Sequence, residues 1–217
     1  NFGESWVVTP GLRINRETKT IDTKGTESCE STTPLPPPTC VTGLLLGTNN
    51  YDRRDLERKE SDVSPKLSVM YYLTEDVNVF ATVSKGFKSG GYNSISFTGE
   101  DLEFEDENAT TLEIGTKGSY LNRSLNVNAT IYRTEYDNLQ VLAFNGVFFD
   151  VSNAATAVSQ GLEVDWQWLT RWEPLAVMGS LGLLDAYYED YTGAPAPVTQ
   201  GVNTRQDLSD ETIAFAP

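Results

Sequence analysis

Hydrophobic and polar residues alternate with a period of two along most of this chain. In one run, Val127 and Ala129 alternate with Asn126 and Asn128. Successive side chains of a β-strand point to opposite faces of a sheet, so this period predicts strands with one hydrophobic and one polar face. Seven runs have hydrophobic members at Trp6, Val8, Pro10, Leu12 and Ile14; Pro65, Leu67, Val69, Tyr71 and Leu73; Val77, Val79, Ala81 and Val83; Leu112, Ile114 and Tyr120; Leu125, Val127, Ala129 and Ile131; Leu162, Val164, Trp166 and Trp168; and Leu175, Val177, Leu181 and Leu183. We expect an eighth strand to begin near Leu208.

The connections between these runs alternate between short and long. Short polar turns are predicted at residues 73–76, 120–124 and 169–174. Long polar connections are predicted at residues 18–56, 88–103, 144–153 and 190–205. Short turns at one end of a set of antiparallel strands and long loops at the other are typical of an outer-membrane β-barrel.

The hydrophobic face supports the same prediction. It is aliphatic, with aromatic residues near the strand ends at Trp6, Tyr71, Tyr120, Trp166 and Trp168. A membrane interface favours aromatic rings at the edges of an apolar band. The predicted fold is therefore all-β, an antiparallel transmembrane β-barrel of which this chain forms about seven or eight strands. The alternative is a soluble β-sandwich binding module, whose strands also alternate.

The charge of the chain excludes several classes of function. The net charge is −15, and the chain has no histidine. A strongly acidic protein lacks the basic face that nucleic-acid binding requires, so no nucleic-acid partner is expected. Without histidine, the commonest general base and the commonest transition-metal ligand are missing. No catalytic constellation, metal site or cofactor is predicted, and we expect the chain not to be an enzyme.

The two cysteines, Cys29 and Cys40, lie in the polar, proline-rich stretch CESTTPLPPPTC. Two cysteines that close a short loop are typical of a disulfide formed in an oxidising compartment. The alternative is a pair of free thiols. Two cysteines with no histidine make a poor zinc site.

The glycine-rich stretch VFATVSKGFKSGGYN, residues 79–93, invites comparison with a phosphate-binding loop. Such a loop is followed by a helix whose N-terminus holds the anion. The residues that follow, YNSISFTGEDLEFEDEN, have no helical period. We therefore interpret residues 79–84 as the upper half of a membrane strand and the glycines as its exit.

Several stretches together resemble TonB-dependent outer-membrane receptors. They are TPGLRIN, VNVFATVSKGFKSGGYN, ENATTLEIGTKGSYLNRSLNVNATIYRTEYDNLQV, SNAATAVSQGLEVDWQWL and DLSDETIAFAP, in that order along the chain. The resemblance covers nearly the whole chain, and residues 18–56 are the least typical part.

This resemblance implies a function and partners. The family imports iron-siderophore complexes, haem, vitamin B12 or some carbohydrates through a 22-stranded barrel around an N-terminal plug, driven through the TonB complex. It implies that residues 1–217 are part of one barrel domain, with the plug and the C-terminal end of the barrel absent. Iron-siderophore uptake across the outer membrane of a Gram-negative bacterium is the expected function, with membrane lipid, the siderophore ligand and, through the plug, TonB as partners. A passive porin-type barrel is the alternative membrane function.

Five charged residues are predicted on the polar face of the strands: Arg13, Glu113, Lys117, Glu163 and Asp165. They are candidates for facing the barrel lumen and contacting a plug or a substrate. The alternative is cross-strand charge pairing that stiffens the wall.

Aromatic residues of the long loops are the candidates for ligand contact: Tyr92, Phe97, Phe144, Phe148, Phe149 and Tyr191. Aromatic side chains offer a large, stiff surface to a flat ligand. The alternative is packing between loops. The acidic segment 101–107 is expected to be a solvated loop, because it lacks the spacing and the glycine of a calcium loop.

Overall fold

The structure is a computed structural model that describes residues 5–26, 50–96, 99–100, 102–144, 149–153, 156–172, 175–196 and 204–213. All regular elements in these ranges are β-strands. Among the same residues, no helix is long and apolar enough to cross a membrane. Cys29 and Cys40 lie outside the described residues, so the disulfide stays a prediction.

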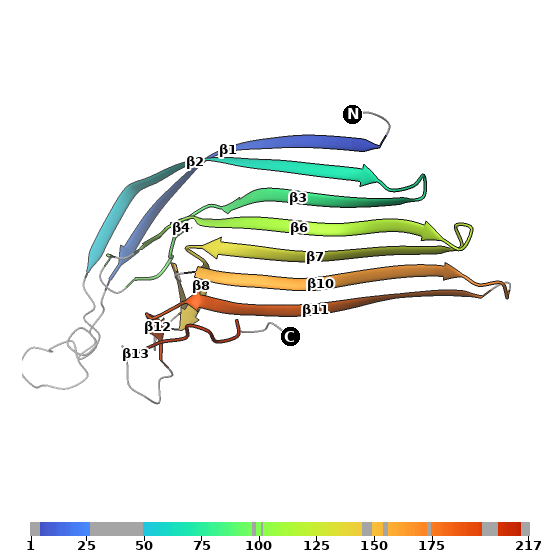
Figure 1. Ribbon diagram of the computed structural model, residues 1–217. Coiled ribbons are helices and arrows are strands. Elements are labelled where there is room, and N and C mark those ends of the chain that lie inside the picture. The colour runs from blue at the N-terminus through green and yellow to red at the C-terminus, as the bar shows by residue number, and fades with distance from the viewer. Residues whose placement is uncertain are drawn as a thin grey trace, which may run out of the picture.

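One curved antiparallel sheet of seven strands forms the body of the molecule (Figure 1). Strands adjacent in the sheet follow one another along the chain, in the order β1-β2-β3-β6-β7-β10-β11. The strands are β1 (Trp6–Gly25), β2 (Tyr51–Tyr72), β3 (Val77–Lys88), β6 (Glu107–Tyr120), β7 (Leu125–Asp137), β10 (Thr156–Leu169) and β11 (Ala176–Asp190). The sheet is open, and it confirms the predicted all-β, partial-barrel fold.

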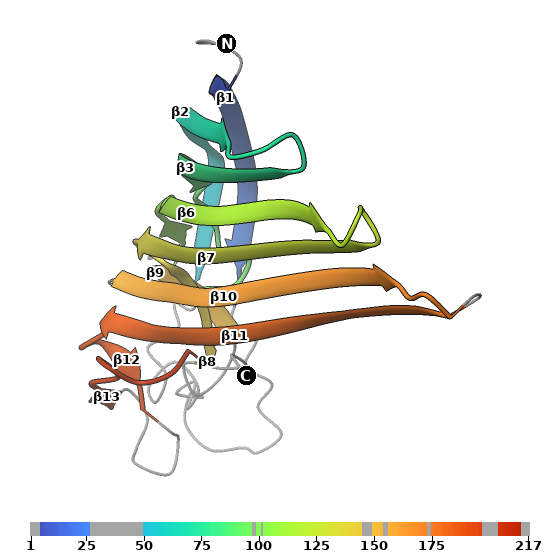
Figure 2. The ribbon, with the colours of Figure 1, turned by 45° about the vertical axis from the view of Figure 1, so that its right-hand side comes forward.

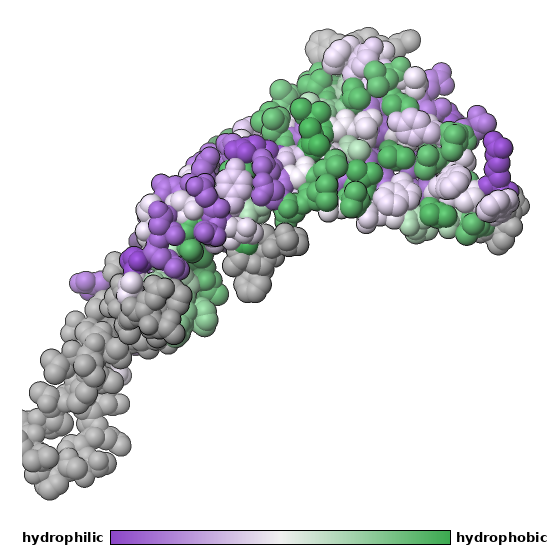
Figure 3. Space-filling view, turned by 60° about the horizontal axis from the view of Figure 1, so that its bottom comes forward, coloured by the Kyte–Doolittle hydropathy of each residue, from purple (hydrophilic) through white to green (hydrophobic). Residues whose placement is uncertain are grey.

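The pairing register confirms the predicted faces. Val8 lies opposite Val69, and Val69 lies opposite Ala81 on the next strand. Further along, Ile131 lies opposite both Ile114 and Leu162. A one-residue slip would move a strand's hydrophobic set to the other face, so these pairs fix one continuous apolar face. Figure 3 shows hydrophobic residues gathered over the long strands.

Among the described residues, no second layer of protein covers this apolar face. Ile114, Ile131 and Leu183 are 49%, 54% and 56% exposed. The buried hydrophobic residues of the described chain are Leu102, Ala157, Val158, Ala186, Tyr188, Tyr191 and Ala194. A soluble sandwich buries the facing sides of two sheets against each other, which this single layer does not do. The sheet therefore argues against the sandwich alternative and for a face that lipid covers.

Three small antiparallel pairs lie at the end of the sheet opposite the short turns (Figures 1 and 2). They are β4 (Gly91–Tyr92) with β5 (Glu103–Phe104), β8 (Gln140–Phe144) with β9 (Phe149–Asn153), and β12 (Ala194–Pro195) with β13 (Arg205–Gln206). A small core of Ala157, Tyr188, Tyr191 and Ala194 forms where these loops meet the long strands. The described parts of the long loops are therefore folded, as a rim over one end of the sheet.

Two predicted boundaries were wrong. The connection predicted at residues 18–56 is much shorter, because β1 continues to Gly25 and β2 begins at Tyr51. The strand predicted to begin near Leu208 is not present in the described residues 204–213, where only an isolated bridge follows Leu208. Leu208 precedes a turn at Asp210, and Thr212 then bridges to Tyr187 on the edge of β11.

Candidate functional site

The rim contains a notch where β2 separates from β3. Pairing between β2 and β3 ends at Lys66 opposite Ser84. Strands β1 and β2 stay paired to Gly25 and Tyr51, whereas β3 follows β6 as far as Lys88. Residues 13–25 and 51–64 therefore form a two-stranded arm that leaves the sheet, as Figure 1 shows.

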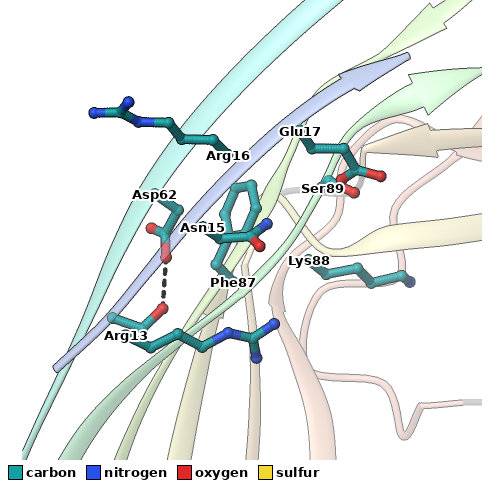
Figure 4. Close-up of a pocket in the computed structure, with 9 residues that line it drawn as sticks. Arg13, Asn15, Arg16, Glu17, Asp62, Phe87, Lys88 and Ser89 are labelled. Atoms are coloured by element: carbon teal, nitrogen blue, oxygen red, sulfur yellow. Dashed lines mark hydrogen bonds between the residues drawn. The ribbon is translucent and has the colours of Figure 1, made fainter. Parts of the chain in front are cut away.

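The β2–β3 notch is a polar cavity of about 560 Å³ (Figure 4). Its lining residues are Arg13, Asn15, Arg16, Glu17, Asp62, Ser64, Phe87, Lys88 and Ser89. Asp62 accepts a hydrogen bond of 2.5 Å from the Ser64 hydroxyl, and a Glu17 carboxylate oxygen lies 3.7 Å from the Lys19 ammonium. Figure 4 shows Arg13 and Lys88 extending to one side of β1 and Arg16 to the other. The notch can hold an oxygen-rich or anionic group by charge and hydrogen bonding.

Lysine and glutamate side chains of the arm hold the chain that follows β3. The Lys19 ammonium donates to the Ser89 hydroxyl at 2.6 Å and to the Gly90 carbonyl at 2.5 Å. The Gly90 amide donates to Glu60 at 3.1 Å. The floor of the notch is thus fixed to both strands of the arm, which makes its shape a property of the fold.

Arg58 is the centre of this attachment. Its guanidinium donates to Glu60 at 2.5 Å, to Glu103 at 2.5 Å and to Glu105 at 2.9 Å. The side chains of Arg58 and Glu60 are only 11% and 10% exposed. These carboxylates, Glu105 first, raise the pKa of Arg58 well above its ordinary value. Glu103 and Glu105 stay 50% and 65% exposed, so these acidic side chains are solvated as expected, and Arg58 compensates part of their charge.

Side-chain amides join the β4–β5 and β8–β9 loops. The Asn93 amide donates to the Val151 carbonyl at 2.9 Å and accepts from the Val151 amide at 2.8 Å. In the same way, Asn153 accepts from the Glu105 amide at 2.8 Å and donates to the Glu105 carbonyl at 3.0 Å. Each asparagine side chain bonds both the N–H and the C=O of one residue in the other loop, as a neighbouring β-strand would. The two loops are therefore joined as one unit.

The predicted ligand-contacting aromatics divide into exposed and buried members. Phe144 and Phe149 pack with their rings tilted by 50° and their centroids 5.1 Å apart at the end of the β8–β9 hairpin, and Phe149 is 64% exposed. Tyr191 is 6% exposed and packs on Tyr188, with centroids 5.0 Å apart. Ligand contact by Tyr191 would require the loops to open. Phe97 and Phe148 lie outside the described residues.

Tyr92 lies beside a smaller cavity of about 420 Å³ between the arm and the β4–β5 loop. The cavity is also lined by Arg53 and Glu103. Desolvation, and then the charge of Glu103, raise the pKa of Tyr92 above its ordinary value. Tyr92 therefore keeps its phenolic proton and can donate a hydrogen bond to an acceptor at the rim.

The register places the predicted polar-face residues on one face of the sheet, but it does not bring them into ion pairs. Lys117 and Asp165 both lie opposite Asn128, from the two sides. Asn128 donates to Asp165 at 2.9 Å, and the Lys117 ammonium lies 5.6 Å from the Phe80 ring centroid. Glu113 and Glu163 lie opposite Tyr132 and Thr130 of β7. Arg13 lies at the notch.

The sequence did not indicate the residues that build the notch, apart from Arg13. Arg58, Lys19 and Lys88 lie in polar stretches without a hydrophobic period, so no local pattern distinguishes them from solvated side chains. Within the described ranges, no group of three or more His, Cys, Asp or Glu side chains is arranged to hold a metal ion. The rim offers binding chemistry from charges, amides and aromatic rings.

A family model described as "TonB dependent receptor-like, beta-barrel" matches residues 1–217. The chain belongs to the TonB-dependent receptor family. It is 29% identical to the pesticin receptor of Yersinia pestis over 127 residues, and this aligned stretch covers 58% of this chain and 18% of that receptor. It is 27% identical over 107 residues to the catecholate siderophore receptor Fiu of Escherichia coli K12, covering 46% of this chain and 14% of that receptor.

The fold is also similar to that of a solved receptor. The ferric yersiniabactin uptake receptor FyuA from Yersinia pestis superposes with a TM-score of 0.65 at 21% identity, over 86% of this chain and 25% of that one. The receptor barrel described here thus corresponds to a part of its relatives, since it spans less than a fifth of the curated relatives named above.

Proposed function

We propose that this chain forms part of the barrel wall of an outer-membrane receptor that imports ferric siderophores, energised through the TonB system. The family match over the whole chain carries the proposal. The names of the relatives support the ligand class, because they include a catecholate siderophore receptor and a ferric-pyoverdine receptor. In this proposal residues 1–217 belong to a single barrel domain of a Gram-negative outer-membrane protein and have no enzymatic role.

The charges and rings of the rim fit this function. A ferric siderophore presents oxygen atoms and aromatic or hydroxamate groups, which the notch cations and the exposed Phe144–Phe149 pair can meet. The notch lies at the loop end of the strands, which in outer-membrane barrels faces the outside. Its attachment through Arg58 and Lys19 would keep the captured ligand close to the lumen-facing surface.

Uptake assays test the proposal directly. The gene that encodes this chain would be deleted from its iron-starved host, and uptake of radiolabelled iron from a ferric catecholate and from ferric yersiniabactin would be followed. We expect loss of uptake of one of these complexes, restored by the gene and abolished by a protonophore. If the restored uptake continued in the presence of the protonophore, a passive porin-type barrel would be favoured instead. Unchanged uptake of both complexes would overturn the siderophore assignment.

A further inference from the structure

A second cavity lies at the opposite end of the sheet, between two neighbouring short turns. It has a volume of about 610 Å³ and lies between the β6–β7 turn and the β10–β11 turn. Figure 2 shows the second turn reaching beyond the first. The lining residues are Leu121, Asn122, Ser124, Trp168, Thr170, Arg171, Trp172, Leu175 and Val177. We call this cavity the turn groove.

The turn groove has a fixed wall on the β6–β7 side. Leu121, Asn122 and Arg123 are all left-handed, with φ of 53°, 59° and 65°. Leucine rarely adopts this conformation, because its Cβ crowds the backbone. The Arg123 guanidinium is held by Asp76 at 2.7 Å, and the Ser124 hydroxyl donates to the Leu121 carbonyl at 2.7 Å. The turn thus keeps the apolar side chain of Leu121 at the groove, although the left-handed backbone conformation of this leucine is energetically unfavourable.

The other wall is tied to the first. The Leu169 amide donates to the Ser124 carbonyl at 2.8 Å, so the two turns share a backbone hydrogen bond. The Thr170 hydroxyl donates to the Leu175 carbonyl at 2.9 Å and closes the second turn. The described walls of the groove are therefore held together before anything binds, which lowers the entropic cost of filling it.

The groove continues the apolar face of the sheet. Trp168 lies opposite Val177 in register, on the same face as Val164 and Leu181. Leu121 and Trp172 stand at its border, 62% and 80% exposed. Asn122, Ser124, Thr170 and Arg171 bring polar groups and a cation to the same site. An apolar wall with a cation beside it matches a molecule that has both a hydrocarbon chain and a phosphate.

We propose that the turn groove is a binding site for one phospholipid of the membrane leaflet that meets the short turns. In this assignment the acyl chain lies against Trp168 and Val177, and the headgroup phosphate pairs with Arg171. Indole rings and an arginine at the edge of an apolar band are suited to the headgroup boundary. The inference rests on the membrane placement in the proposed function, but not on the transported ligand.

Native mass spectrometry of the intact receptor, extracted from outer membranes in mild detergent, tests the site. We expect one phospholipid to remain on the wild-type protein. Arg171→Gln and Leu121→Asn should each lower the retained fraction of phospholipid by about tenfold. This factor corresponds to a loss of about 1.4 kcal/mol in the free energy of lipid binding. Asparagine tolerates the left-handed conformation, so Leu121→Asn removes the apolar wall without harming the turn.

Leu73→Asn is the matched control. Leu73 is an exposed leucine of another short turn, 56% exposed, and it does not line the groove. It should leave lipid retention unchanged. Absence of phospholipid from the wild type, retention of lipopolysaccharide or detergent alone, or equal losses for Leu73→Asn and Leu121→Asn would overturn the proposal. Because retention is measured without transport, a failed uptake assay with retained lipid would reject only the proposed ligand.

Discussion

The Arg58 guanidinium of β2 donates to the Glu103 carboxylate of β5 at 2.5 Å, across 45 positions of the chain. This contact joins the arm to the loop that follows β3. Arg58 lies between Glu60 of the arm and the carboxylates of the acidic segment, which would repel one another without it. The notch, the β4–β5 loop and the β8–β9 loop therefore depend on one another.

Arg58→Met should detach the β4–β5 loop from the arm. It leaves Glu60, which is 10% exposed, without its cation, so we expect a local loss of about 2 kcal/mol in loop stability. The measurement is amide hydrogen exchange of residues 89–105 in the intact receptor. Arg54→Met is the matched control, because Arg54 pairs with Asp52 on the surface at 68% and 43% exposure. Exposed pairs contribute little, so equal effects of the two variants would contradict this account.

Gly115→Ala should destabilise the barrel wall, whereas Gly182→Ala should not. A Cβ at Gly115 would lie 2.6 Å from the Ala129 carbonyl oxygen and 2.6 Å from the Phe80 ring. A Cβ at Gly182 would meet no atom within 4 Å. We expect a loss of about 1–3 kcal/mol for the first and a gain of up to about 1 kcal/mol for the second. Thermal unfolding in detergent compares them, and indistinguishable midpoints would be evidence against the register.

Ile131→Lys should block membrane insertion, and Thr130→Lys should permit it. The two residues are neighbours on β7 and point to opposite faces, with Ile131 54% exposed on the apolar face. A lysine that faces lipid near the middle of the membrane costs about 2–4 kcal/mol, whereas one that faces the lumen is tolerated. The heat-modifiable folded band in isolated outer membranes reports insertion. Normal insertion of Ile131→Lys would mean that the apolar face does not meet lipid.

The β8–β9 hairpin should become less stable as the pH rises. Burial raises the pKa of Asp150 above its ordinary value of 3.8. A carboxyl group with a raised folded-state pKa contributes stability below its unfolded pKa, and this contribution is lost as the pH rises through the folded pKa. Asp150→Asn should remove this pH dependence. Protection factors of the hairpin amides, corrected for intrinsic exchange, measure it.

Asp207 gives the opposite sign and serves as the control. The Ser209 hydroxyl and backbone amide, which bond to its carboxylate, lower the pKa of Asp207 below 3.8. Its contribution is therefore present above that value and is lost as the pH falls through the folded pKa. The pH dependence of amide protection would be measured around each residue. If Asp150→Asn and Asp207→Asn changed this dependence in the same direction, burial would not be the cause at Asp150.

The sequence by itself determined the strands and their faces. The alternation of Val127 and Ala129 with Asn126 and Asn128 is sufficient, because side-chain direction in a strand depends only on local backbone geometry. The short turns and the apolar face follow from the same pattern. The family resemblance rests on these stretches too.

Only the tertiary structure decided the rim. Residues 18–25 and 51–62 are mostly polar, with Ile21, Tyr51 and Leu56 as their hydrophobic members, so no local period of two predicts the arm, which is held by main-chain pairing between distant segments. Arg58 finds its carboxylates 45 and 47 positions away, and Tyr191 enters a core that only the folded loops create. Charge pairing and burial depend on which segments meet in space, and a period of two along the chain does not contain that information.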